Sequence, residues 1–496
     1  MKKYPTIAAV DLGSNSFRLQ VARVEDDQIY LLDSLKDTVR LGAGLGPDKT
    51  LDQDTCIRAL ASLSRFGERL RGLPRGAVRA VGTNTFRVAK NAQEFLQQAE
   101  AALGFPIEII AGREEARLIY LGVSHGLPYT NEKRLVVDIG GGSTEFIIGA
   151  GLIPQQMESL YMGCVSYSQR FFPNGKISKS ALREANLAAR TELQTIHNEF
   201  SAAHWQHAIG SSGTAKALSE ILQMNGYSDS GITPAGLTKL RDAMLRAGDC
   251  NKLQLAGLRA DRVPVLAGGY AIMAAIIDEL NIPGMSVADT ALREGVLYDQ
   301  LGRFHSQDMR ETTVNQFMRR YQVDLLQSRH VGQLGINLLR QLGTAQSLDI
   351  DAALQRFSWA ARLHEIGLSI AHSGFHKHSA YILENADMPG FSKKEQAQLS
   401  RLVLAQRGSL IKAAQPLPDN ESLSQILALR LAVLFYRSRR DFELPEIRLS
   451  WQGSSFELSM SKDWFSQNPL TETALENEAK EWKSVGLKLG ISSTLP

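Results

Sequence analysis

The stretch RLVVDIGGGSTEFIIGAG at residues 134–151 decides the fold, because an earlier stretch of the chain repeats it. Residues 7–24 read IAAVDLGSNSFRLQVARV, and the two align when Asp11 is placed on Asp138, an offset of 127 residues (138 − 11 = 127). Each copy has an apolar segment, an Asp, a turn of small residues and a second apolar segment, the pattern of a β-hairpin with a tight turn. The repeat predicts two similar halves whose hairpin turns face each other across a cleft.

Around the two hairpins, residues 1–300 alternate between short apolar segments and amphipathic ones. The predicted elements are a strand at 78–81, a helix at 91–103, a strand at 107–110, a helix from Gly112, a helix over 178–200, and a short segment at 265–269 that runs into an apolar helix at 270–280. Strands mixed with helices in this way indicate α/β layers.

The pattern changes near residue 300. Residues 312–440 carry apolar side chains at three- and four-residue spacing, which predicts an almost entirely helical region. Residues 447–451 and 455–459 alternate between apolar and polar, as two paired strands would, and a polar helix is predicted around 472–486.

Composition and charge exclude several classes of protein. The chain has 496 residues, which at roughly 150 residues per domain suggests two to four domains. Lys and Arg number 55 and Asp and Glu 52, and a net charge of +3 is too balanced for a histone-like or basic-tailed nucleic-acid binder. Apolar residues make up 44% and charged residues 22%, an ordinary globular composition. We expect no nucleic-acid partner.

The cysteines and the N-terminal region are typical of a protein from a reducing cellular compartment. Cys56, Cys164 and Cys250 are far apart and show neither a disulfide framework nor zinc-site spacing, which favours a reducing environment. The short apolar run at 7–10 ends at Asp11, so it is neither a signal peptide nor a membrane span. We expect a cytoplasmic protein without a transmembrane segment.

Both hairpin turns are rich in groups that bind anions. A turn of Gly and Ser exposes successive backbone N–H groups and hydroxyls, which together form a concave anion site. Residues 140–143 read GGGS, and residues 13–16 read GSNS as a weaker copy. A single Gly-rich turn is common in hairpins. Two such turns, each after an Asp that ends a strand, indicate a phosphate site.

Carboxylates flank the two turns. Mg²⁺ prefers carboxylate oxygens together with retained waters and phosphate oxygens. Asp138 ends one strand and Glu145 begins the next, and Asp11 would contribute from the opposite half. The alternative interpretation is that Asp11 and Asp138 bond the backbone of their own turns.

Two further motifs carry candidate chemistry. Glu114 and Glu115 lie in the first turn of a predicted helix, where carboxylates suit the helix dipole, and one of them facing the cleft would serve as a base for water. Residues 82–87, GTNTFR, follow a strand and end in Arg87, whose guanidinium can hold phosphate oxygens in pairs. A capped helix with a surface arginine is the alternative for this segment.

Together these motifs resemble the exopolyphosphatase / guanosine-pentaphosphate phosphohydrolase family, within the actin, sugar kinase and heat-shock ATPase superfamily. The matching segments are AAVDLGSNSFRLQVARV at 8–24, VGTNTFRVAKN at 81–91, IEIIAGREEARLIYLGV at 107–123, VVDIGGGSTEFIIG at 136–149, MGCVS at 162–166, GSSGT at 210–214, ALREGVLY at 291–298 and LHEIGLSIAHSGFHKHSAYIL at 363–383. They extend through most of the chain, and only its last part is weakly diagnostic.

The resemblance implies an α/β fold class built from duplicated actin-like (ribonuclease H-like) halves. The implied domains are two actin-like halves at 1–125 and 126–300, an all-helical HD-like domain at 301–441 and a small α+β C-terminal domain at 442–496.

The HD-like domain departs from the His-Asp phosphohydrolases that it resembles. It has His364-Glu365 where they have an adjacent His-Asp pair, and beyond His330 no full set of metal ligands is evident. We expect this domain to be non-catalytic and to serve in chain binding or dimer contacts.

The resemblance also implies the roles of the site residues. Glu115 matches the catalytic base, and Asp138 and Glu145 match residues that hold Mg²⁺, with Asp11 as a further candidate. The residues that match substrate contacts are Ser14, Asn15 and Ser16 in the first turn, Gly141, Gly142 and Ser143 in the second, and Arg87.

The implied activity is Mg²⁺-dependent, processive removal of the terminal phosphate of linear inorganic polyphosphate by a homodimeric exopolyphosphatase. A long polyanion would need a basic path, for which the candidates, with solvated surface charge as the alternative, are Arg113, Arg117, Lys377, His372, His376 and His378.

Other activities remain open at this stage. The third glycine in 140–142 and the segment 372–378 favour polyphosphate, whereas the segment 437–441 is typical of the branch that removes the 5′-terminal phosphate of guanosine pentaphosphate. That hydrolysis is the main alternative, alone or beside the first. An ATP-dependent kinase and a non-catalytic alarmone sensor are also compatible with an actin-like fold.

Overall fold

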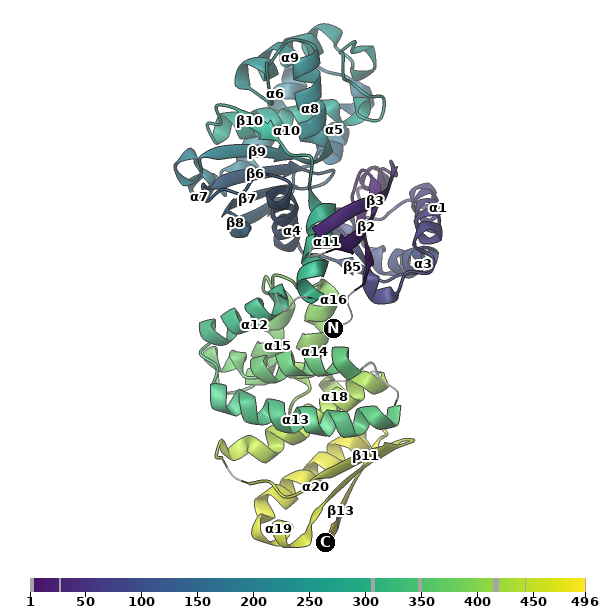
Figure 1. The fold of residues 1–496 in the computed structure, drawn as a ribbon, viewed down its shortest axis with the longest axis vertical. Coiled ribbons are helices and arrows are strands. Elements are labelled where there is room, and N and C mark those ends of the chain that lie inside the picture. Colours follow the sequence, from purple (N-terminus) through teal and green to yellow (C-terminus); the bar gives the residue numbers. More distant parts are fainter. Residues whose placement is uncertain are drawn as a thin grey trace. The chain divides into compact units, whose positions relative to one another are not determined.

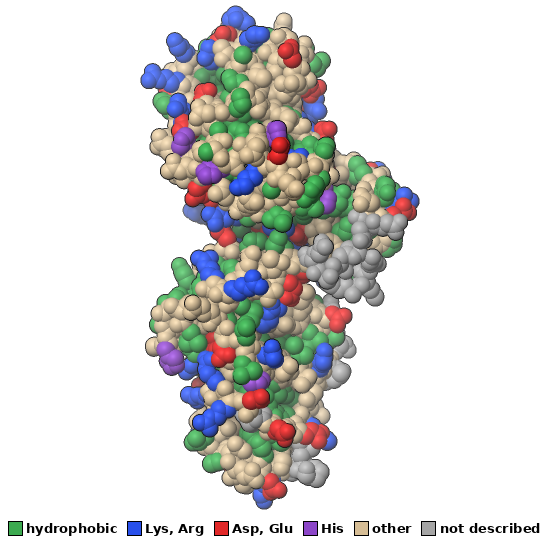
Figure 2. Space-filling model, turned by 60° about the vertical axis from the view of Figure 1, so that its left-hand side comes forward, with side chains coloured by type: hydrophobic (Ala, Val, Ile, Leu, Met, Phe, Trp, Pro, Cys, Tyr) green, Lys and Arg blue, Asp and Glu red, His purple; other side chains and the backbone are tan. Residues whose placement is uncertain are grey.

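The computed structural model describes residues 4–25, 28–304, 308–346, 350–413, 419–441 and 443–495. They form two compact units, residues 1–309 and 310–496 (Figure 1). On the face drawn in Figure 2, basic and acidic side chains are interspersed over both units. No helix among the described residues is long and apolar enough to cross a membrane.

The first unit contains two five-stranded sheets with the same topology. Strands β1 (Thr6–Leu12), β2 (Phe17–Glu25), β3 (Gln28–Asp37), β4 (Val78–Gly82) and β5 (Ile107–Ile109) form one sheet in the order β3-β2-β1-β4-β5. Strands β6 (Arg134–Ile139), β7 (Thr144–Ala150), β8 (Ile153–Leu160), β9 (His207–Ser211) and β10 (Met285–Val287) form the other in the matching order β8-β7-β6-β9-β10. The first three strands of each pair antiparallel and the last two add in parallel. The repeat in the sequence is therefore a repeat in the fold, and the duplicated α/β prediction is confirmed.

The hairpin registers place the flanking charged residues opposite each other. Asp11 pairs with Arg18 across β1 and β2, and Asp138 pairs with Glu145 across β6 and β7. Directly opposed residues of an antiparallel pair project from the same face of the sheet. Arg18 therefore occupies in the first half the position that Glu145 occupies in the second (18 + 127 = 145).

Helices, most of them amphipathic, cover the outer faces of both sheets. Helix α1 begins where the Asp52 side chain accepts a hydrogen bond from the Thr55 N–H, and it buries Ala59, Leu63 and Phe66 at helical spacing. The helices of the outer layers are α1 (Gln53–Leu70), α2 (Asn84–Val88), α3 (Ala92–Leu103), α5 (Cys164–Phe171), α6 (Lys179–Leu193), α7 (His197–Phe200), α8 (Ser212–Met224), α9 (Pro234–Ala247) and α10 (Leu266–Glu279).

Two of these elements differ from the sequence prediction. The helix predicted over 178–200 ends at Leu193, and residues 197–200 form the separate short helix α7. The segment 265–269 belongs almost wholly to α10, which begins at Leu266 and is buried on nearly all sides. A helix that is apolar all round shows no amphipathic period, so its start is not visible in the sequence.

Two further helices cross between the sheets. Helix α4 (Gly112–His125) follows the first sheet in sequence but packs against β7 and β8 of the second, whereas α11 (Leu292–Phe304) packs against β1 of the first (Figure 1). Their apolar side chains share one core with the inward faces of both sheets. The predicted boundary after residue 300 lies inside α11, and the four-domain division stays a prediction.

Two glycines allow α4 and α11 to approach closely. A Cβ atom on Gly122 would lie 2.0 Å from the carbonyl oxygen of Ala291, and one on Gly295 would lie 1.7 Å from that of Leu118. These atoms belong to the backbone of the facing segment and cannot move aside separately. Any larger residue at either position must push the two helices apart.

The second unit combines helices with a small sheet on one hydrophobic core. Its helices are α12 (Met309–Arg320), α13 (Leu325–Gln346), α14 (Ile350–Leu363), α15 (Phe375–Asn385), α16 (Lys393–Leu404), α17 (Leu410–Ala413) and α18 (Asn420–Phe435), followed by α19 (Lys462–Gln467) and α20 (Pro469–Ser484). Strands β11 (Arg448–Gln452) and β12 (Ser455–Ser461) form the predicted antiparallel pair, and β13 (Lys488–Leu495), which was not predicted, adds in parallel to β12.

We expect Gly295→Ala to destabilise the first unit. Alanine normally stabilises a helix relative to glycine, but here the clash with the Leu118 carbonyl should outweigh that gain and cost about 2 kcal/mol or more. Urea denaturation followed by circular dichroism measures the change. Gly284→Ala is the matched control, because nothing lies within 4 Å of a Cβ at that position. Equal stability of the two variants would contradict the close helix crossing.

Candidate active site

A polar cleft in the first unit lies between the two hairpin turns. Its empty volume is about 880 Å³, including the part open to solvent. Both turns line it, at 13–16 and 140–143, together with Asp11, Asp138 and Glu115. The structure therefore brings together, from both halves of the repeat, most of the residues that the sequence singled out.

The two turns touch each other at the cleft. A Cβ on Gly141 would lie 2.9 Å from the Cβ of Ser14 and 3.0 Å from the amide nitrogen of Asn15, so glycine is required there by the close approach. The first turn is held by hydrogen bonds from the Gly42 N–H to the Ser14 carbonyl and from the Arg40 N–H to the Asn15 carbonyl. The approach of the turns is thus fixed by packing from both halves.

Backbone N–H groups of the two turns remain available to an anion. Among the described residues, no acceptor takes a hydrogen bond from the amides of residues 14–16 or of residues 141–143. The Gly140 N–H donates to the Ser143 carbonyl at 2.9 Å, which closes the second turn. A cluster of backbone amides without a partner in the protein, at the wall of a cleft, suits a phosphate group.

The carboxylates near the turns are buried or half-buried, and they are close enough to repel one another. Burial raises the pKa of Asp11 to about 7, against the opposing effect of Arg293 and Arg18. Burial likewise raises the pKa of Asp138 to about 6, although hydrogen bonds from Ser212 and Ser211 lower it. A cation bound beside these two carboxylates would offset the cost of burying their charge.

Glu145 lies behind Asp138 rather than on the cleft wall. Its side chain is 1% exposed and accepts a hydrogen bond from the Ser159 hydroxyl at 2.9 Å. Burial, Glu115 and Asp138 raise the pKa of Glu145 well above its usual value. Glu145 does not itself line the cleft in this structure.

Glu115 is the glutamate of the pair that faces the cleft, and Arg87 holds it. The Arg87 guanidinium donates to the Glu115 carboxylate at 2.8 Å and to the Ile110 carbonyl at 3.0 Å. Glu115 lines the cleft, whereas Glu114 does not and instead bonds Arg117. Arg87, predicted as a phosphate contact, is likewise not part of the cleft wall, and its role stays a prediction.

Sequence reasoning missed four cations of the cleft wall. They are Arg18, Lys216, Arg262 and Arg293. Arg18 stands in the repeat at the position of Glu145, which was a visible signal. Arg293 lies within the matched motif ALREGVLY, but nothing in the sequence indicates that it reaches Asp11 across the fold.

The predicted basic path is wrong at Arg117. Its guanidinium is buried and bonds Glu114 and Asp299, so it is not open to a polyanion. Arg113 pairs with Glu158, with 2.7 Å between the closest charged atoms. The other candidates, Lys377 and the histidines at 372, 376 and 378, belong to the second unit.

The HD-like part of the second unit holds its histidines by contacts within the fold. The His364 ring is fully buried, with Nδ1 2.8 Å from the Ala361 carbonyl oxygen, and the His330 ring stacks on Tyr436. The Glu365 carboxylate bonds Arg439. Among the described residues of the chain, no three His, Cys, Asp or Glu side chains converge as a group able to hold a metal ion.

The chemistry of the cleft nonetheless fits Mg²⁺. Asp11 and Asp138 supply oxygen donors on opposite turns, and Mg²⁺ is usually held by one or two carboxylates, with waters and substrate phosphate completing its shell. A complete cage of protein ligands is therefore not required for this ion.

Comparison with known proteins agrees with this geometry. The Ppx/GppA phosphatase family model matches residues 20–304, and the model of Ppx/GppA phosphatase, domain III, matches residues 309–479. The similar solved structures include an exopolyphosphatase from Cytophaga hutchinsonii, which is 24% identical with a TM-score of 0.55 over 60% of this chain and 98% of that one. An exopolyphosphatase-like protein is 24% identical with a TM-score of 0.56, over 61% of this chain and 100% of that one.

The crystal structure of the Aquifex aeolicus member of the Ppx/GppA family is 25% identical, with a TM-score of 0.50 over 60% of this chain and 98% of that one. The two likenesses at 24% identity support the fold of the part that they cover, and the family models extend over both units. With its paired Gly/Ser turns, its cleft glutamate and these matches over most of its length, the chain belongs to the Ppx/GppA phosphatase family.

Proposed function

We propose that this phosphatase is an exopolyphosphatase, which removes the terminal phosphate of linear inorganic polyphosphate in a Mg²⁺-dependent, processive reaction. One observation carries the proposal. The unpartnered amides of two turns meet in a cleft that also contains a glutamate and four cationic side chains. This combination suits a chain of phosphates with a reactive end.

The turns and the cations would bind different parts of the phosphate chain. Backbone N–H groups of residues 14–16 and 141–143 would donate to the oxygens of the terminal phosphate, where negative charge develops in the transition state. Arg18, Arg262 and Arg293 on the cleft wall would neutralise the following phosphates of the chain. The arginines would therefore contribute mainly to substrate binding, and the backbone amides to stabilisation of the transition state.

Glu115 is the proposed general base. In the reaction the oxygen of a water bonds to the terminal phosphorus, Glu115 takes a proton from that water, and the bond from this phosphorus to the bridging oxygen breaks. The bridging oxygen leaves on the shortened chain, whose new end is again a phosphate, and orthophosphate is released. Arg87 orients the Glu115 carboxylate through the 2.8 Å ion pair.

Asp138 and Asp11 would hold Mg²⁺, with Glu145 behind them. When bound, the ion neutralises charge on the phosphate oxygens. The buried carboxylates support this assignment, because without a counter-ion their charge is costly in the folded cleft. Glu145 faces Asp138 across the hairpin and would add a second negative charge behind the ion.

We expect Glu115→Gln to lower kcat for orthophosphate release from long-chain polyphosphate at least about 10²-fold, because a general base contributes about 10²–10⁴-fold. Gel analysis of the remaining chains at partial turnover of the wild type also tests processivity, since a processive enzyme leaves few chains of intermediate length. Glu132→Gln is the control, because that side chain is 59% exposed and pairs with His207. Wild-type kcat in the Glu115 variant would exclude this base.

We expect EDTA to abolish turnover and added Mg²⁺ to restore it. Asp138→Asn should raise the Mg²⁺ concentration for half-maximal rate by about tenfold or more, because the amide lacks the charge that holds the ion. Binding of Mn²⁺, followed by electron paramagnetic resonance without substrate, tests the site apart from activity. The exposed Asp242→Asn is the control, with a side chain 48% exposed. Full activity in EDTA would contradict the metal assignment.

The second candidate is hydrolysis of the 5′-terminal phosphate of guanosine-5′-triphosphate-3′-diphosphate. The cleft favours it in one respect, because the wall continues past the turns to Thr214, Lys216 and Asp289, whose polar side chains would contact a group larger than a phosphate. We expect kcat/KM to be higher for long-chain polyphosphate than for guanosine pentaphosphate when both are measured on the wild type. Turnover of guanosine pentaphosphate alone would replace our proposal with this candidate.

A further inference from the structure

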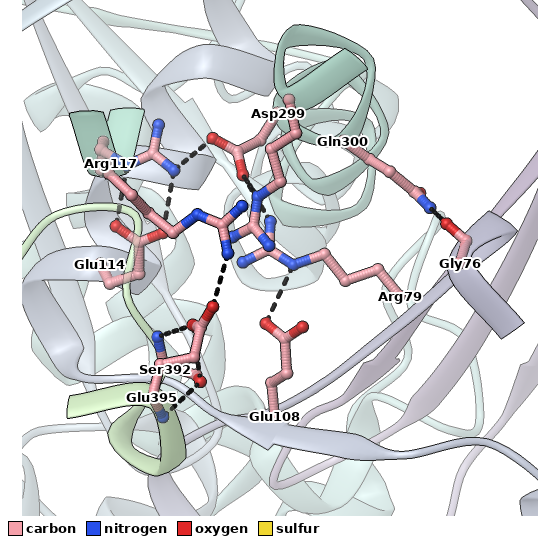
Figure 3. Close-up of polar contacts among 11 residues, drawn as sticks. Gly76, Arg79, Glu108, Glu114, Arg117, Asp299, Gln300, Ser392 and Glu395 are labelled. Atoms are coloured by element: carbon pink, nitrogen blue, oxygen red, sulfur yellow. Dashed lines mark hydrogen bonds and ion pairs between the residues drawn. The ribbon is translucent and has the colours of Figure 1, made fainter. Parts of the chain in front are cut away.

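A buried ion network anchors the helix that carries Glu115. Asp299 on α11 accepts from Arg79 of β4 at 2.6 Å and from Arg117 of α4 (Figure 3). Arg117 in turn donates to both carboxylate oxygens of Glu114, at 2.8 Å each. Asp299 thereby links the first sheet, α11 and the first turn of α4 through side chains that are almost fully buried.

The network ends one residue from the proposed base. Glu114 and Glu115 are neighbours in the first turn of α4, and successive helical residues point about 100° apart. Glu114 is turned toward Arg117, and Glu115 is therefore turned toward the cleft. A rotation or shift of this turn would move the Glu115 carboxylate directly.

The ion pairs of the network are buried, so they fix the geometry of the helix, unlike charged side chains exposed on the surface. Burial opposes ionisation of Asp299, but Arg117, Arg79 and Arg303 together lower its pKa below the usual value. The side chains of Asp299 and Arg117 are each 5% exposed. Charged pairs buried in this way tolerate little displacement, because either partner left alone keeps an uncompensated charge.

We propose that Asp299 is a positioning residue for the reaction. Through Arg117 and Glu114 it sets the rotation and the axial position of the first turn of α4, and so the place of the Glu115 carboxylate. This inference rests on the proposed function, in which Glu115 is the base. Asp299 itself lies outside the cleft wall.

Loss of the Asp299 charge should lower kcat and leave KM nearly unchanged. Asp299→Asn should lower kcat for polyphosphate by about tenfold or more, because small misplacements of a reacting group reduce rates strongly. The KM should change by less than about twofold, since residues 13–16 and 140–143 line the cleft whereas Asp299, Arg117 and Glu114 do not. Glu108→Gln is the matched control, because Glu108 pairs with Arg79 of the same cluster, at 3.1 Å, but is not bonded to α4 (Figure 3).

A double-mutant cycle separates positioning from general loss of structure. If Asp299 acts through Glu115, then Asp299→Asn should cause no further loss of kcat in the Glu115→Gln background. The same fold-loss in both backgrounds would overturn the proposal, and so would an unchanged kcat in the single variant. If Asp299→Asn does not fold, Glu114→Gln serves instead, because it removes the charge that Arg117 holds and keeps the size of the side chain.

Hydrogen exchange on the full-length protein supplies a readout that does not depend on the substrate. We expect amides at the start of α4, residues 115–118, to exchange faster in Asp299→Asn than in Glu108→Gln. Unchanged exchange in that segment would overturn the mechanical link. If the wild type releases no phosphate from polyphosphate, the proposed function fails while the exchange result still decides whether Asp299 holds α4.

Discussion

The close crossing of α4 and α11 between the two sheets is the constraint on which the first unit depends. Gly122 and Gly295 leave no room for a side chain, so the two helices meet backbone to backbone. Helix α4 packs against the second sheet and α11 against the first, so the two halves share one hydrophobic core. Because the hairpin turns project from these same sheets, the helix crossing also sets the distance across the cleft.

The cleft holds carboxylates whose ionised form is destabilised by desolvation, and this arrangement indicates that the cleft binds a ligand. Three carboxylates, the half-buried Asp11 and the buried Asp138 and Glu145, lie near one another, and desolvation raises the pKa of each. A folded protein tolerates such a group when it serves a ligand. Cations on the same wall and unpartnered amides on the turns complete a site that suits both a phosphate chain and a metal ion.

Duplication produced two halves with one topology and different chemistry. The matched hairpin position is Arg18 in the first half and Glu145 in the second, so one hairpin presents a cation to the cleft and the other places a second carboxylate beside Asp138. Glu114 and Glu115 also have the same residue type and different roles, here at adjacent positions of one helix. One glutamate is used inside the fold to hold the helix, and the other faces the cleft.

The sequence by itself determined the repeat, the two turns and the helical character of the second unit, because these features depend on local periodicity and on glycine positions. The order of the strands in the sheets came from the structure. It did not determine which charged side chains meet. Arg117 was predicted as a candidate for a basic path and is buried, whereas Arg18, Arg262 and Arg293 line the cleft and were not predicted. The physical reason is that ion pairing and burial depend on residues far apart in the chain, such as Asp299 with Arg117, which only the tertiary fold brings together.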